Sequence, residues 1–141
     1  MDYKRDKDQV FVALSSGDHI ISNLEKIVLK ENILSGHIFA IGAVSSVEIG
    51  YLEVSEKSYK RKIFNCEYEI INISGNITLK NGKPFIHAHI VLSDSDYRVF
   101  GGHLFEGCIS TVGELIINIG KVTIDRKWDE NIGLYTWNIG H

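Results

Sequence analysis

The chain has little of what marks several large classes of protein. Its 141 residues include one proline and two cysteines, which excludes a proline-rich hinge and a disulfide-stapled scaffold. No apolar run approaches the ~18 residues that a membrane-spanning helix requires. Residues 1–8 are highly charged and lack the apolar core of a signal peptide. We therefore expect a soluble, cytoplasmic protein with no membrane partner.

An excess of positive charge is also absent. The formal net charge is −3 and the calculated isoelectric point is about 6.0, whereas domains that hold nucleic acid by its phosphates commonly have values above ~9. One basic cluster exists, but Lys60 and Lys62 alternate with Arg61 along a strand, which is typical of a solvated edge strand guarded by lysines. The charge does not support DNA binding.

The composition is that of a packed domain. A hydrophobic content of 44% suffices for a core, and this length is typical of one domain. We expect a single domain over residues 1–141, with a core at about 10–125 and an aromatic tail at 126–141 that packs across the sheet or a neighbouring subunit. Cys66 and Cys108 stand among apolar residues, which predicts buried, reduced thiols.

Residue periodicity predicts one helix and many strands. Apolar residues at helical spacing predict a helix over 19–32, with Asp18 as its cap. Alternating and apolar runs predict strands at 9–15, 38–41 continuing through Gly42 into 44–54, 59–66, 68–79, 84–92, 97–104, 108–118 and 121–125. Turn residues at 81–82, 94–96 and 118–120 indicate hairpins. The sum is an α+β fold, with a largely antiparallel, barrel-like β-sheet and one main N-terminal helix packed against it.

The most informative motif is His87-Ala88-His89, followed by Gly101-Gly102-His103. Two histidines one residue apart on a strand point to the same face. A three-residue loop at 94–96 would place His87 opposite His103 and His89 opposite Gly101, where the missing side chain leaves room for an ion. The three imidazoles would then converge from one face of a hairpin.

Three imidazoles suit a divalent transition metal. Zn²⁺ fits them best, although Ni²⁺, Cu²⁺ and Fe²⁺ also accept nitrogen ligands. Three protein ligands leave a fourth position for water or substrate, which is typical of a chemically competent site. Alternatively, the histidines have only a structural role and hold strands or subunits together.

Three further stretches accompany the histidines: Gly42 to Tyr51, Tyr68 to Ile77, and His87 to Asp94 with Gly101 to Leu104. Together they resemble the plant-and-prokaryote-conserved (PPC) domain. That resemblance implies a mixed α/β domain, a homotrimer and a DNA-binding role with a PD1-like motif. The chain departs from the plant pattern because it has no Arg-Gly-Arg-Pro core of an AT-hook, and an acidic residue, Glu67, stands where the plant proteins have a basic one.

The histidine segment is also similar to the zinc site of acetolactate decarboxylase, which carries His-x-His and then Gly-Gly-His. That similarity implies His87, His89 and His103 as ligands. It does not extend to the reaction, because a fold and a ligand set can serve different chemistries.

Three carboxylates are candidates for a general base beside such a metal: Glu69, Glu114 and Glu106. A carboxylate in such a position more often faces solvent. Asp94 and Asp96 are best interpreted as turn residues that bond the local backbone. Three functions stay open at this point: a metal-dependent protein acting on a small molecule, as an enzyme or a sensor; a DNA-associated module; and a trimeric interaction scaffold.

Overall fold

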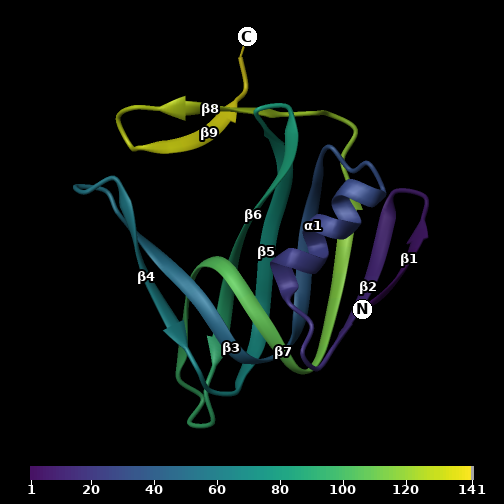
Figure 1. Cartoon of the computed structure of the whole chain (residues 1–141), viewed down its shortest axis with the longest axis vertical. Helices are drawn as coiled ribbons and strands as arrows, with labels where there is room; N and C mark the ends of the chain where they lie inside the picture. Colours follow the sequence, from purple (N-terminus) through teal and green to yellow (C-terminus); the bar gives the residue numbers. More distant parts are fainter. Residues whose placement is uncertain (141) are drawn as a thin grey trace.

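A computed structural model describes residues 1–140 as a curved sheet with one helix against it (Figure 1). The helix α1 spans Ile20–Lys30. The strands are β1 (Asp2–Asp6), β2 (Gln9–Ser15), β3 (Gly36–Glu53), β4 (Ser58–Phe64), β5 (Tyr68–Lys80), β6 (Lys83–Ser93), β7 (Val99–Ile119), β8 (Asp125–Asp129) and β9 (Leu134–Asn138). The predicted α+β class with a largely antiparallel sheet and an N-terminal helix is confirmed.

Two long strands organise the sheet. β7 pairs with β6 near its start, with β3 along most of its length and with β2 near its end. β5 joins β3 to β6, so the hydrogen bonds run around a ring of β3, β5, β6 and β7. β4 is an edge strand that pairs with β3 alone among the described strands. The sheet is therefore barrel-like without being a closed barrel.

The hydrophobic core lies between α1 and one face of this sheet. The helix buries Leu24 and Ile27 on its inner face, and β6 contributes Ala88, Ile90 and Leu92. Because side chains alternate along a strand, the residues between them on β6 face away from the core. His87 and His89 are two of these residues, so core packing itself fixes the face on which they stand.

The cap of the helix differs from the prediction. Asp18 does not cap it: its carboxylate accepts a hydrogen bond from the Ser15 amide at 2.8 Å and pairs with the terminal amine. Glu106, on β7, instead accepts bonds from the Ile21 amide at 2.8 Å and from the amide and hydroxyl of Ser22 at 3.1 and 2.6 Å. Sequence spacing could not indicate this, because a residue 85 positions away supplies the acceptor.

Replacing Glu106 with alanine should therefore destabilise the fold without weakening metal binding. The loss of a carboxylate at a helix N-terminus costs about 1–2 kcal/mol, measurable by urea denaturation. The matched control is Glu25→Ala, which removes an exposed carboxylate from α1 away from its N-terminus and should be nearly neutral. Equal unfolding free energies for the two variants would contradict the capping role.

Several local predictions need correction. Residues 121–124 are not a strand, and the β8–β9 hairpin replaces the predicted run at 121–125. The turn at 118–120 makes no hairpin, because β7 continues through Asn118. Cys66 is exposed and Cys108 only half-buried, although both are free as expected. The Asn81-Gly82 hairpin is confirmed, with both residues at positive φ.

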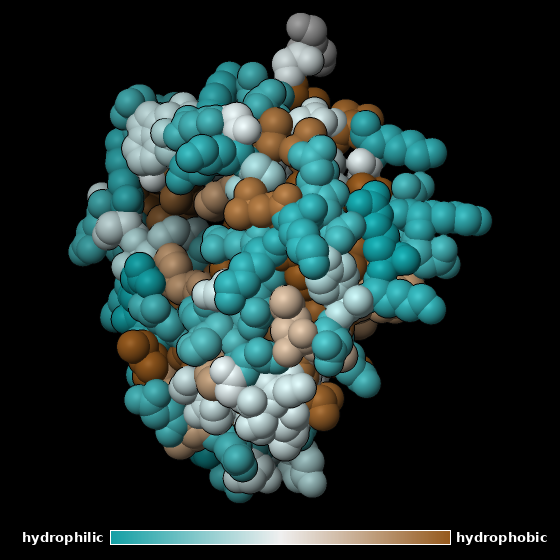
Figure 2. Space-filling view, turned by 45° about the vertical axis from the view of Figure 1, so that its right-hand side comes forward, coloured by the Kyte–Doolittle hydropathy of each residue, from teal (hydrophilic) through white to brown (hydrophobic). Residues whose placement is uncertain are grey.

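No helix in residues 1–140 is long and apolar enough to cross a membrane. The face seen in Figure 2 is mostly hydrophilic, with apolar atoms in small separate patches. A hollow opens at its upper left, below the β8–β9 hairpin that crowns the molecule in Figure 1.

Candidate metal centre

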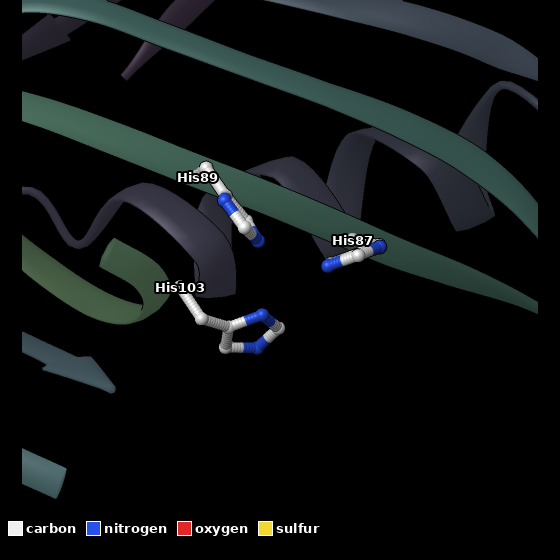
Figure 3. A group of neighbouring side chains, drawn as sticks. All are labelled: His87, His89 and His103. Carbon is white, nitrogen blue, oxygen red and sulfur yellow. The ribbon is translucent and has the colours of Figure 1, made fainter. Parts of the chain in front are cut away.

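The three histidines of the motif lie together on the face of the sheet opposite α1. His87 and His89 stand on β6, and His103 stands on the neighbouring β7 (Figure 3). Each offers one ring nitrogen within 4.8 Å of the nitrogens of the other two. Within residues 1–140, this is the one group of three or more histidines, cysteines or carboxylates close enough to share an ion.

The predicted register of this hairpin is wrong by two residues. His89, not His87, lies opposite His103, and Gly101 lies opposite Val91. The loop is longer than expected because Asp94 organises five residues: its carboxylate accepts bonds from the amides of Asp96 at 2.9 Å and Arg98 at 3.0 Å. A shift of two residues keeps every side chain on its original face. The cluster therefore survives the correction.

Gly101 consequently has a different role from the one predicted. A Cβ atom built at this position would lie 2.2 Å from the carbonyl oxygen of Ile90. Glycine is needed here because β6 and β7 approach too closely for any side chain. It opens no space beside His89.

The residues present fit a divalent metal. Nitrogens bound to one Zn²⁺ at about 2.0–2.1 Å in tetrahedral geometry stand about 3.4 Å apart. Rotation of the imidazoles has to draw them together by on the order of 1 Å from the arrangement described here, which side-chain torsions allow. The rings already lie close, with centroids 5.0 Å apart for His87 and His103 and 5.2 Å apart for His87 and His89.

The surroundings keep two of these imidazoles neutral. Burial lowers the pKa of His87 to about 4, and the neighbouring His89 adds to the effect. Burial likewise lowers the pKa of His103 to about 4, with a smaller contribution from His87. The neutral imidazole is the form that binds metal. At pH 7 both rings therefore have a nitrogen lone pair available for an ion.

Aromatic side chains hold His103 in place. Its ring lies tilted against Tyr59 of β4 and edge-on to Phe105 of β7, with centroids 4.7 Å away in both cases. The Tyr59 hydroxyl lies 3.4 Å from Nδ1 of His103, and burial raises the pKa of that hydroxyl. Outer contacts of this kind orient a metal-binding histidine and set its tautomer.

A cavity of about 250 Å³ adjoins the histidines. His87 and His103 form part of its wall, and the β8–β9 hairpin closes another side with Trp128, Leu134 and Tyr135. The predicted aromatic tail thus packs beside the histidines as a hairpin, which β8 attaches to the end of β5 by two parallel pairs.

The three carboxylate candidates lie in three other places. Glu106 caps α1, as described above. Glu69 is exposed on β5, beside a separate polar depression that includes Asp94 and Tyr97. Glu114 is exposed on β7, near Phe11 and Phe39. None of them lines the cavity at the histidines or joins the histidine cluster.

Sequence reasoning missed the second half of this site. No sequence motif marks Tyr59, Lys80 or Arg126 as part of a site. The parallel pairing of Lys80 with Arg126 brings together positions far apart in the chain. The aromatic residues of the tail were the one available signal.

The sequence of this chain is similar to those of known proteins. Residues 1–120 match the Plants and Prokaryotes Conserved (PCC) domain, the family that the sequence resembles. A curated relative, the bifunctional protein GlmU of Synechococcus sp. (strain JA-3-3Ab), is 26% identical over 105 residues, or 74% of the chain. The chain spans only 16% of the length of that relative.

Solved structures share the whole fold. A candidate DNA-binding protein of Bacteroides thetaiotaomicron superposes with a TM-score of 0.93 at 28% identity, over 97% of this chain and 96% of that one. A metal-containing protein of Archaeoglobus fulgidus has a TM-score of 0.84 at 32% identity, covering 96% of both chains. Acetolactate decarboxylase of Bacillus subtilis, at 19% identity, covers 89% of this chain and 58% of its own with a TM-score of 0.56, and so shares the fold alone.

Proposed function

The chain belongs to the Plants and Prokaryotes Conserved (PCC) domain family, and we propose that it binds a divalent transition metal to act on a small organic molecule. The ligands are His87, His89 and His103, and Zn²⁺ is the ion that this set of nitrogens suits best. A metal with three protein ligands keeps one position for a ligand and acts there as a Lewis acid.

One observation carries this proposal: three imidazoles from two adjacent strands converge beside a cavity. Structural zinc sites are usually closed by four protein ligands, whereas three ligands beside a cavity are typical of sites that admit a small molecule. The relative from Archaeoglobus fulgidus, which is described as metal-containing, adds independent support.

The chain's own residues would prepare such a site in two ways. The packing of Tyr59 and Phe105 restricts the His103 ring, which lowers the conformational cost of binding an ion. The β8–β9 hairpin lines the cavity with Trp128, Leu134 and Tyr135, which makes this side of its wall largely apolar.

Elemental analysis of untagged protein tests the proposal. We expect about one equivalent of a divalent transition metal per chain after supplementation with Zn²⁺, and we expect its removal by a chelator to be reversible. Metal content that stays far below one equivalent under these conditions would contradict it.

We also propose that the chain assembles as a homotrimer, as the family resemblance implies. An apolar stripe supports this assembly: Phe11, Phe39, Ile41 and Val112 are 43–48% exposed on the face opposite α1. Phe11 and Phe39 both lie opposite Ile116, on either side of β7, so they form one continuous row. A second copy of the chain is the natural cover for such a row.

Sedimentation equilibrium measures the assembly directly. We expect the wild type to have three times the chain mass and Phe39→Glu to be a monomer, because a buried carboxylate would oppose association. Ile63→Glu is the matched control: it adds the same charge at a position that is 59% exposed on the edge strand β4. A monomeric wild type would contradict the proposal, as would dissociation of both variants alike.

DNA binding is the competing function. The description of the Bacteroides thetaiotaomicron relative favours it, whereas the net charge of −3 does not. Arg61 of the basic cluster pairs with Glu48 at 2.8 Å, which reduces the free positive charge further. Binding to duplex DNA that weakens steeply with salt would support this function. We expect no retardation of duplex DNA even at low salt.

A further inference from the structure

The cavity beside the histidines is lined by cations and aromatic rings. Its wall contains the side chains of Arg126 and Lys80, five aromatic residues besides the histidines, and no carboxylate. Cavities that contain unpaired cations attract anions, because a low-polarity wall strengthens the electrostatic field inside. The composition of this cavity therefore points to an anionic ligand.

Arg126 is held with its guanidinium group in a fixed position. Its Nε donates to Thr78 Oγ1 at 2.7 Å, Nη1 donates to the Tyr135 carbonyl oxygen at 2.8 Å, and Nη2 donates to Asn76 Oδ1 at 2.9 Å. A guanidinium group has five N–H donors, so one donor on Nη1 and one on Nη2 have no partner among these contacts. Unpartnered donors on the two Nη atoms can bond the oxygens of a carboxylate.

The positive charge of Arg126 is not neutralised within the described residues. No ion pair in residues 1–140 includes Arg126, and the three acceptors that it contacts are neutral oxygens. Burial lowers the pKa of its guanidinium group, which shows that the charge is held at a cost. A half-buried arginine without a counter-ion is what an anion-binding site requires before its ligand arrives.

The rest of the wall suits an apolar ligand body. Phe85 lies under Arg126, with the guanidinium carbon 5.1 Å from the ring centroid. Lys80 lies over both Phe85 and Tyr135, with Nζ 5.0 and 4.3 Å from their centroids. The volume of about 250 Å³ is below the range of about 300–1,000 Å³ typical of drug-sized ligands. The occupant is therefore a small molecule.

We propose that Arg126 binds the carboxylate of a small organic acid whose apolar body lies against Phe85 and Tyr135, with its far end toward His87 and His103. The role of the far end depends on the proposed metal, whereas the contact of the carboxylate with Arg126 does not. Arg126 is thus a substrate-binding residue that selects acids over neutral molecules of the same shape.

Benzoate and benzamide are a matched pair of probes, since they share a shape and differ in charge. Isothermal titration calorimetry on Zn²⁺-loaded and on metal-free protein should show that benzoate binds at least about tenfold more tightly than benzamide. Arg126→Gln should lose at least about tenfold in benzoate affinity, as expected for a charge-assisted hydrogen bond. Arg126→Lys keeps the positive charge but loses the planar guanidinium group. Its affinity for benzoate should lie between those of Arg126→Gln and the wild type.

The control is Arg98→Gln, which makes the same change at an exposed arginine outside the cavity wall. Arg98 lies in the β6–β7 loop, where it pairs with Asp94 and Asp96. It should bind benzoate like the wild type. Equal benzoate affinity of Arg126→Gln and wild type would overturn the proposal, because the acid would then bind the metal directly. Equal affinity for benzoate and benzamide in the wild type would also overturn it, even if Arg126→Gln failed to fold.

Elemental analysis of the same samples separates this proposal from the metal proposal. If the wild type takes up Zn²⁺ but shows no preference for benzoate, the metal proposal stands and the acid-binding proposal is wrong. If the wild type takes up no metal but still prefers benzoate, and Arg126→Gln removes that preference, the acid-binding proposal stands and the metal proposal is wrong.

Discussion

Replacing His87, His89 or His103 with alanine is expected to lower Zn²⁺ affinity by more than about 100-fold in each case. Loss of an outer contact to a metal ligand already costs about 10–100-fold, and the loss of one ligand of three should cost more. The cluster consists of these three residues, with their nitrogens within 4.8 Å of one another. No fourth ligand within residues 1–140 is therefore available to replace a missing one. Competition titration with a chromogenic chelator measures the effect.

The matched control is His37→Ala. His37 is exposed on the adjacent β3 and contacts Ser74 at 3.5 Å, and it does not belong to the cluster. This variant should bind Zn²⁺ like the wild type. Unchanged affinity in all three cluster variants would show that the ion binds elsewhere, and equal losses in His37→Ala would show that the effect is not specific to the cluster.

Gly101→Ala is expected to destabilise the fold strongly. Its Cβ atom would lie 2.2 Å from the carbonyl oxygen of Ile90 and 3.2 Å from the Cα atom of Val91, so β6 and β7 would have to separate. Overpacking of this kind costs about 2–3 kcal/mol, equivalent to roughly 8–12 °C in Tm for a chain of this size. Because His89 pairs with His103 two residues along the same ladder, Zn²⁺ affinity should fall as well.

Gly140→Ala is the control for this substitution, since a Cβ atom at that position meets nothing within 4 Å. Its Tm should equal that of the wild type. A Gly101→Ala variant that melts like the wild type would show that the two strands are further apart than the structure places them.

The histidine cluster could be predicted because its signal is local. Alternation along a strand puts His87 and His89 on one face whatever the register, and the apolar Ile90 and Leu92 fix which face is buried. The loop length was not predictable from Asp94-Ser95-Asp96, since the side-chain bonds of Asp94 extend the turn to Arg98. The error was an even number of residues, so the face was right although the partners were wrong.

The parts that sequence could not supply all depend on distant contacts. Glu106 caps α1 from another element, and Arg126 reaches the cavity because β8 pairs with the end of β5. Neither contact is associated with a periodicity or a motif spacing in the sequence. The long strand β7 was predicted in two pieces, 97–104 and 108–118, because its ladder with β3 has an irregularity between Leu104 and Glu106, whereas β3 continues through Gly42 as expected.

The most direct measurement is an anomalous difference map from crystals of untagged, Zn²⁺-loaded protein, recorded above and below the zinc absorption edge. The account predicts one strong peak per chain, about 2.0–2.1 Å from a ring nitrogen of His87, His89 and His103. A map without a peak between these three rings, or with its peak at other residues, would contradict it.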